Sequence, residues 1–138
     1  MQKKFSGKLY SGASKYSLGP KKYFKGKISE RAVVNSLKKN NFQVIAKNIS
    51  IICGSPFEKL TKVEIDIMGR NNSKEVWIIE VKTISRYFDY EFGILKDTQK
   101  YRLIKAQYKL QKLNPGLRFY LVLATVDYEN KIKFYHLT

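Results

Sequence analysis

The spacing of hydrophobic and polar positions along the chain predicts a mixed α/β fold. Apolar residues recur every three to four positions in residues 28–37 and 103–113, which is the period of an amphipathic helix. Runs rich in β-branched and aromatic residues predict strands. These strands are expected at 42–53, 60–69, 75–83, 117–126 and 131–137. The predicted order is therefore one helix, three strands, a second helix and two strands.

Turn and cap residues give the expected bounds of these elements. Ser29 is a predicted N-cap for the first helix, and "KKNN" at 38–41 is expected to end it. The second helix is expected to be capped by Asp97 or Thr98. The predicted buried stripe of that helix consists of Leu103, Ala106, Leu110 and Leu113. The Asn-Asn-Ser turn within 70–74 joins the second and third strands as a hairpin.

Length and composition indicate one packed domain with a basic arm. The chain has 138 residues, of which 43% are hydrophobic, which is enough for a single core. Residues 1–27 hold eight lysines and no acid, and they predict a flexible arm ahead of a domain at 28–138. No apolar run is long enough to span a membrane, and no signal peptide is expected. One cysteine and one histidine exclude a thiolate or imidazole zinc site and suit the cytoplasm.

The charge of the chain indicates a partner that is dense in phosphate. Lys and Arg number 27 against 11 acids, for a net charge of +16, which favours nucleic acid over an anionic membrane or another acidic surface. The tyrosines of the arm either stack on bases or belong to a solvated tail, and the aromatic segment 87–92 either stacks on unpaired bases or closes the core. The candidate phosphate-binding residues are Lys21, Lys22, Lys25, Lys27, Arg86, Lys100 and Lys105.

Three acids lie within strands that are otherwise apolar. A hairpin centred near Ser73 places Asp66 opposite Glu80 and Glu64 opposite Lys82. Two carboxylates at that spacing repel each other unless a proton or a cation lies between them. Oxygen ligands of this kind suit Mg²⁺ or Mn²⁺, which keep their waters and are completed by substrate phosphate. The pattern therefore favours a metal site.

Ion pairs are the structural alternative, with Glu64 bound to Lys82 and Asp66 bound to Lys62. In the metal-site interpretation, Lys82 orients the attacking water or neutralises charge that develops on the phosphate. Glu30 is a third candidate acid and lies in the first turn of the first predicted helix. It is either a functional residue or an acid that favours the helix dipole.

Asp66 followed by Glu80-Val81-Lys82, within the order αβββαβ, resembles the PD-(D/E)xK nuclease superfamily. More closely, the chain resembles the YraN-like family of small endonuclease-like bacterial proteins. "KGKISER" at 25–31 and "IIEVK" at 78–82 also resemble archaeal Holliday-junction resolvases. The matching positions of the YraN-like pattern are Gly26, Glu30, Ala32, Asn48, 64–66, 80–82, Arg102, Leu103, Ala106 and Arg118-Phe119.

The resemblance implies a restriction-endonuclease-like core with a mixed central sheet flanked by helices. It implies a metal-dependent DNA endonuclease that acts on branched or structured DNA, with a non-catalytic nucleic-acid-binding module as the alternative. It implies Asp66 and Glu80 as ligands of Mg²⁺ or Mn²⁺, Lys82 as the catalytic lysine and Glu30 as a further acid. Glu64 stays open as a ligand or as the partner of Lys82.

Two expectations concern the second helix and the assembly. Gln99 precedes Leu103 by four residues and so is expected to face the sheet, in preference to Lys100. This makes Gln99 a fifth candidate for the catalytic site. Cutting both strands of a duplex symmetrically would need a homodimer, although no stretch of the sequence indicates an interface.

Overall fold

The computed structural model describes residues 19–54, 57–84 and 95–137, with side chains from Gly26 onward. Several predictions therefore lie outside the described residues. These are most of the basic arm, Arg86, the aromatic segment 87–92 and the side chains of Lys21, Lys22 and Lys25.

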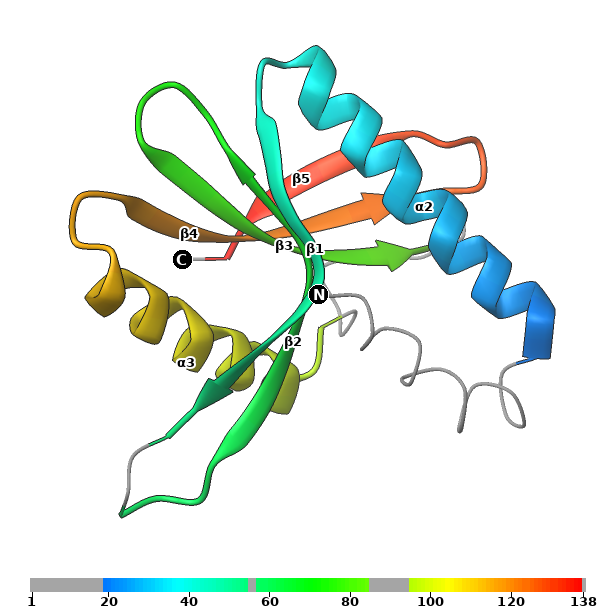
Figure 1. Cartoon of the computed structure of the whole chain (residues 1–138). Coiled ribbons are helices and arrows are strands. Elements are labelled where there is room, and N and C mark those ends of the chain that lie inside the picture. Colours follow the sequence, from blue (N-terminus) through cyan, green and yellow to red (C-terminus); the bar gives the residue numbers. More distant parts are fainter. Residues whose placement is uncertain (1–18, 55–56, 85–94, 138) are drawn as a thin grey trace.

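The described residues form two helices and five strands in the predicted order. The elements are α2 (Gly19–Lys39), β1 (Gln43–Cys53), β2 (Thr61–Arg70), β3 (Glu75–Thr83), α3 (Asp97–Leu113), β4 (Arg118–Val126) and β5 (Ile132–His136). Figure 1 shows the sheet between the two helices. The predicted fold class, a mixed α/β core with helices flanking a central sheet, is confirmed.

The five strands form one sheet in the order β1-β2-β3-β4-β5. Each neighbouring pair is antiparallel except β3 and β4, which are parallel. Parallel neighbours need a crossover connection, and α3 lies between β3 and β4 in the chain and is part of it (Figure 1). The N-terminal end of α3 lies near the C-terminal half of β3, since Gln99 of α3 bonds to Glu80 of β3.

The two helices cover opposite faces of the sheet. Val33 and Leu37 of α2 pack in a cluster with Ile79 of β3, whereas Leu103 of α3 packs in a separate cluster with Ile78. Ile78 and Ile79 are 1% and 0% exposed, so adjacent residues of β3 bury both faces of the strand. A polar group in the middle of β3 must consequently find partners inside the protein.

The predicted start of the first helix is wrong. α2 begins at Gly19 instead of Ser29, so Ser29 lies within the helix and caps nothing. Its Oγ lies 2.6 Å from Oγ1 of Thr83 on β3, and its side chain is buried. The missed signal is Pro20, because proline is favoured in a first helical turn. α2 crosses residue 27, and the division of the chain into arm and domain stays a prediction.

The second helix departs from the prediction at both ends. Lys96 occupies the N-cap of α3 without a side-chain cap, and Asp97 and Thr98 belong to its first turn. Leu103 and Ala106 are buried as predicted, but Leu113 is 66% exposed and does not belong to the buried stripe. The last turn of α3 therefore presents an apolar side chain to its surroundings.

Candidate active site

The predicted β2–β3 hairpin register is confirmed up to the point where the site begins. Gly69 pairs with Trp77 and Ile67 pairs with Ile79, and the ladder ends there. The expected backbone pairing of Asp66 with Glu80, and that of Glu64 with Lys82, is therefore wrong. The two strands separate just where their acids begin.

The carboxylate of Asp66 bridges the strands beyond the end of the ladder. Its Oδ2 accepts a hydrogen bond of 2.8 Å from the backbone N–H of Val81. Val81 lies between Glu80 and Lys82, so this bond holds Asp66 beside the residues that the motif links to it. A side-chain oxygen takes the role that a backbone carbonyl has in the ladder, and the predicted proximity of Asp66 and Glu80 is achieved by this route.

Glu80 is buried, and its carboxylate is bound from two sides. Gln99 Nε2 donates a 2.6 Å hydrogen bond to Oε2, and Nζ of Lys82 lies 3.4 Å from the same oxygen. Lys82 therefore pairs with Glu80 and not with Glu64. Gln99 lies in the first turn of α3 and faces the sheet, which confirms its predicted orientation. The N-terminal end of α3 thus positions the acid at the end of β3.

Glu30 approaches the same point from α2. It is partly buried, and its carboxylate bonds to the side chain of Asn48 on β1 and lies near Lys27 and Lys47. Its charge acts on both Asp66 and Glu80. α2 and α3 cover opposite faces of the sheet, and the separation of β2 from β3 lets both helices contribute to one site. Asn48 has a φ of 52°, a left-handed conformation that asparagine tolerates better than most residues.

All three acids have a raised pKa, mainly because they are buried. Burial raises the pKa of Asp66 well above its ordinary value, and the charges of Glu80 and Glu30 add to the rise. The Val81 N–H and the Lys82 ammonium oppose it. Burial is also the largest cause of the raised pKa of Glu80 and of Glu30. An additional positive charge at this point would stabilise all three ionised forms.

Glu64 lies apart from this cluster. It is exposed, and it lines a hollow of about 370 Å³ together with Glu80, Gln99 and Arg102. Lys62 lies at the same hollow. Arg102 was not predicted as a site residue, although its position three residues after Gln99 is the spacing of neighbours on one helix face. The hollow gives a molecule outside the protein access to Glu80.

The donor set is suited to a hard divalent cation. Within the ranges that the structure describes, no three His, Cys, Asp or Glu residues are placed to hold a metal together. Mg²⁺ is commonly bound by only one or two carboxylates, with waters and substrate phosphate as the remaining ligands. Asp66 and Glu80 are two such carboxylates, and burial is the largest cause of their raised pKa values, which a bound cation would lower.

The predicted phosphate-binding lysines are only partly described. Lys27 is partly buried near Glu30, and its charge lowers the pKa of that acid. Lys100 and Lys105 are partly buried on α3, and Nζ of Lys105 lies 5.0 Å from the centre of the Tyr101 ring. None of these contacts by itself identifies a phosphate ligand.

Comparison with known proteins gives one family match and one similar structure to report. A family profile described as "NERD: Nuclease-related domain" matches residues 25–124, a range that contains all five candidate site residues. No curated protein matches the chain. A crystal structure of SSO0001 has a TM-score of 0.55 at 17% identity, and the match covers 98% of this chain and 60% of that one. That likeness concerns the fold. In the described residues, no helix is long and apolar enough to cross a membrane.

Proposed function

Since the chain belongs to the nuclease-related domain family, a PD-(D/E)xK-like nuclease family, we propose that it is a metal-dependent DNA endonuclease. The proposed site consists of Asp66, Glu80 and Lys82, with Glu30 and Gln99 beside them. Membership of the family supports a nuclease-related function. The proposal adds that the activity depends on a metal and that the substrate is DNA.

One observation carries the proposal more than any other. Asp66 and Glu80 lie together where β2 and β3 separate, both have a raised pKa, and Lys82 lies 3.4 Å from Glu80. Burying two acids side by side costs stability, and strongly perturbed acids of this kind occur most often at functional sites. Phosphodiester hydrolysis needs carboxylates that bind a cation and an ammonium group near the scissile phosphate, and this arrangement supplies both kinds of group.

Each residue of the chain has a separate task in this proposal. Mg²⁺ or Mn²⁺, held by Asp66 and Glu80, would supply Lewis-acid stabilisation of the charge on the scissile phosphate. The Val81 N–H fixes the orientation of Asp66, and Gln99 fixes that of Glu80. The Lys82 side chain is 32% exposed, so its ammonium can reach a phosphate or orient the attacking water.

Glu30 and Glu64 have weaker claims. Glu30 is close enough to act electrostatically on both ligands, which supports its proposed place as a further acid of the site. Glu64 lines the hollow beside Glu80 but is not a cause of the pKa shifts of Asp66 or Glu80. We therefore assign it no ligand role.

A non-catalytic nucleic-acid-binding module is the alternative function. The observation that favours it is the pairing of Glu80, since Lys82 and Gln99 already satisfy one of its oxygens. In such a module Lys82 would serve to neutralise a buried acid and would have no part in hydrolysis. The two functions differ in what divalent cations and the Lys82→Ala substitution do.

The substrate and the assembly belong to the proposal as well. Branched or structured DNA, in the manner of Holliday-junction resolvases or the YraN-like family, is the proposed substrate in the cytoplasm, and two copies would be needed to cut both strands symmetrically. The test is a cleavage screen of labelled single-stranded, duplex, flap and four-way DNA, and of RNA, in Mn²⁺, Mg²⁺ or EDTA. Cleavage of a DNA in Mn²⁺ and none in EDTA supports the proposal, whereas the absence of any cleavage leaves only the binding module.

A further inference from the structure

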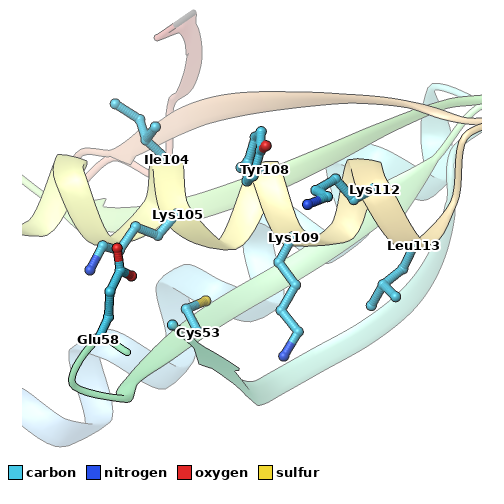
Figure 2. A pocket seen from close by; sticks show the side chains of 9 residues that line it. Cys53, Glu58, Ile104, Lys105, Tyr108, Lys109, Lys112 and Leu113 are labelled. Carbon is cyan, nitrogen blue, oxygen red and sulfur yellow. The ribbon is translucent and has the colours of Figure 1, made fainter. Parts of the chain in front are cut away.

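A second hollow lies along α3, away from the proposed active site. We call it the α3 hollow. It has a volume of about 610 Å³ and lies between the second half of α3 and the Cys53 end of the β1–β2 hairpin. Its apolar lining includes Cys53, Ile104 and Leu113. Figure 2 shows Lys109 and Leu113 extending from α3 on the side of the helix that faces this hairpin.

Three lysines give the α3 hollow its charge. Lys105, Lys109 and Lys112 line it, against one acid, Glu58. Lys109 donates a hydrogen bond from Nζ to the backbone oxygen of Ile52, which holds its ammonium between the helix and the hairpin. An apolar lining with an excess of positive charge complements a ligand that has a flat apolar body and a negative group. A nucleotide of a polynucleotide strand has that chemistry, and pockets of roughly 300–1,000 Å³ are the size that binds one such group.

Tyr108 supplies a surface on which a base can stack. Its side chain is 65% exposed and lines the α3 hollow, and Nζ of Lys112 lies 5.1 Å from the centre of its ring. An exposed aromatic ring next to lysines is the arrangement that binds single strands, because every base has a face to stack and every nucleotide has a phosphate. A duplex already buries the faces of its bases, so this site favours an unpaired one.

The α3 hollow and the active-site hollow follow each other along the same helix. Gln99 and Arg102 line the active-site hollow, and Lys105 and Tyr108 line the α3 hollow. Gln99 and Tyr108 are roughly 13.5 Å apart along the helix axis, given a rise of about 1.5 Å per residue, and about half a turn apart around the helix, given about 3.6 residues per turn. A stacked strand covers the axial distance with roughly four nucleotides at about 3.4 Å each, and passing around the helix requires a longer strand.

We propose that the α3 hollow binds one unpaired base of the substrate strand, stacked on Tyr108, with the neighbouring phosphates on Lys105, Lys109 and Lys112. The bound nucleotide lies at least about four positions from the phosphate at Glu80. This distance rests on the proposed nuclease function, since that function places the scissile phosphate. The binding itself requires no cleavage. The hollow thereby directs the enzyme to DNA with a single-stranded segment next to the cut.

The test compares two exposed tyrosines of α3, of which only Tyr108 lines the α3 hollow. Tyr101 and Tyr108 are 60% and 65% exposed, and each has a lysine Nζ about 5 Å from its ring, but Tyr101 does not line either hollow. The affinity of a short fluorescein-labelled oligothymidine is measured by anisotropy with the full chain in EDTA. We expect Tyr108→Ala to weaken binding by about 5- to 150-fold, the usual effect of losing one stacked base. Tyr101→Ala should leave the affinity near that of wild type.

An abasic probe identifies stacking as the cause. Abasic sites are placed at successive positions of the oligothymidine. At one position the missing base should weaken binding to wild type but not to Tyr108→Ala, because the two changes remove the same contact. Circular dichroism of both variants confirms that α3 stays folded.

Three results would overturn the inference. The first is an equal loss of oligothymidine affinity in Tyr101→Ala and Tyr108→Ala, and the second is an unchanged oligothymidine affinity in Tyr108→Ala. The third is that Tyr108→Ala weakens the binding of phosphatidylglycerol vesicles while its affinity for oligothymidine equals that of wild type. Because binding is measured in EDTA, a chain that cuts no DNA in Mn²⁺ can still show the Tyr108 effect. Failure of the nuclease proposal is thus distinguishable from failure of this inference.

Discussion

The backbone N–H of Val81 donates a 2.8 Å hydrogen bond to Oδ2 of Asp66, and this bond ties β2 to β3 just beyond their last ladder pair. Asn at position 66 keeps an oxygen that can accept the same bond and removes the charge. Because burial and two neighbouring acids raise the pKa of Asp66, the ionised carboxylate costs stability. We therefore expect Asp66→Asn to raise the melting temperature at neutral pH in EDTA.

The pH dependence of stability gives a second test of the raised pKa values. Between the ordinary carboxyl pKa and the raised values of Asp66 and Glu80, the folded state binds more protons than the unfolded state. Stability therefore falls as pH rises through this window and is regained as pH is lowered. We expect the melting temperature of wild type to depend more steeply on pH there than that of Asp66→Asn. An equal slope in both proteins would contradict the assignment. Glu64→Gln, which removes an exposed acid, is the control for overall charge.

Divalent cations should stabilise the protein through the same two acids. A ligand that binds only the folded state adds about 2.7 kcal/mol at a hundredfold excess over its dissociation constant. We expect Mn²⁺ to raise the melting temperature of wild type and of Glu64→Gln. The melting temperatures of Asp66→Asn and Glu80→Gln should stay the same with and without Mn²⁺. Calorimetry or fluorescence melting measures the shift. A shift that persists in Asp66→Asn would place the cation elsewhere.

Gln99 should act by positioning Glu80. Gln99→Ala removes the 2.6 Å hydrogen bond to Oε2 and leaves Lys82 as the described partner of that oxygen. Partners of this kind typically contribute 10- to 100-fold to metal affinity or activity, so we expect cleavage in Mn²⁺ to fall by about that factor. More Mn²⁺ should restore part of the loss. Gln43→Ala, at an exposed position of β1, is the matched control. Wild-type cleavage by Gln99→Ala would rule out the positioning role.

Ser29 and Thr83 should be energetically coupled. Their hydroxyl oxygens lie 2.6 Å apart and join α2 to the end of β3. A double-mutant cycle of Ser29→Ala and Thr83→Val, measured by urea unfolding, should give a coupling of about 0.5–1.5 kcal/mol. An N-cap at Ser29 would instead give a loss for Ser29→Ala that is independent of Thr83.

These residues also illustrate what the sequence can predict. The hairpin register followed from local alternation and one turn, and Ile67 pairs with Ile79 as expected. The acids were recognisable because carboxylates are costly inside apolar strands. Ser29 was misread because capping chemistry is local, whereas its partner Thr83 lies 54 residues away. The end of the ladder was not predictable, because alternation along β2 and β3 is the same before and after Ile67 and Ile79.

The contact between Gln99 and Glu80 was predictable only in part. Its spacing from Leu103 predicted the face of the helix, but only the crossover from β3 to β4 brings that face to the acid. The two hollows beside α3 depend on where the β1–β2 hairpin lies, which no local pattern encodes. The separation of β2 from β3 is likewise a property of the packed sheet, and it is what joins Glu30 to Asp66 and Glu80.

Cleavage by Lys82→Ala tests the central claim most directly. Wild type, Lys82→Ala, Asp66→Asn and Lys133→Ala are compared on one DNA that wild type cuts in Mn²⁺, with Lys133 as an exposed lysine of β5. We expect Lys82→Ala and Asp66→Asn to cut at least about a hundredfold more slowly than wild type while still binding the DNA. Lys133→Ala should cut at the wild-type rate. Cleavage by Lys82→Ala and Asp66→Asn at the wild-type rate would contradict the claim that these residues form a nuclease site.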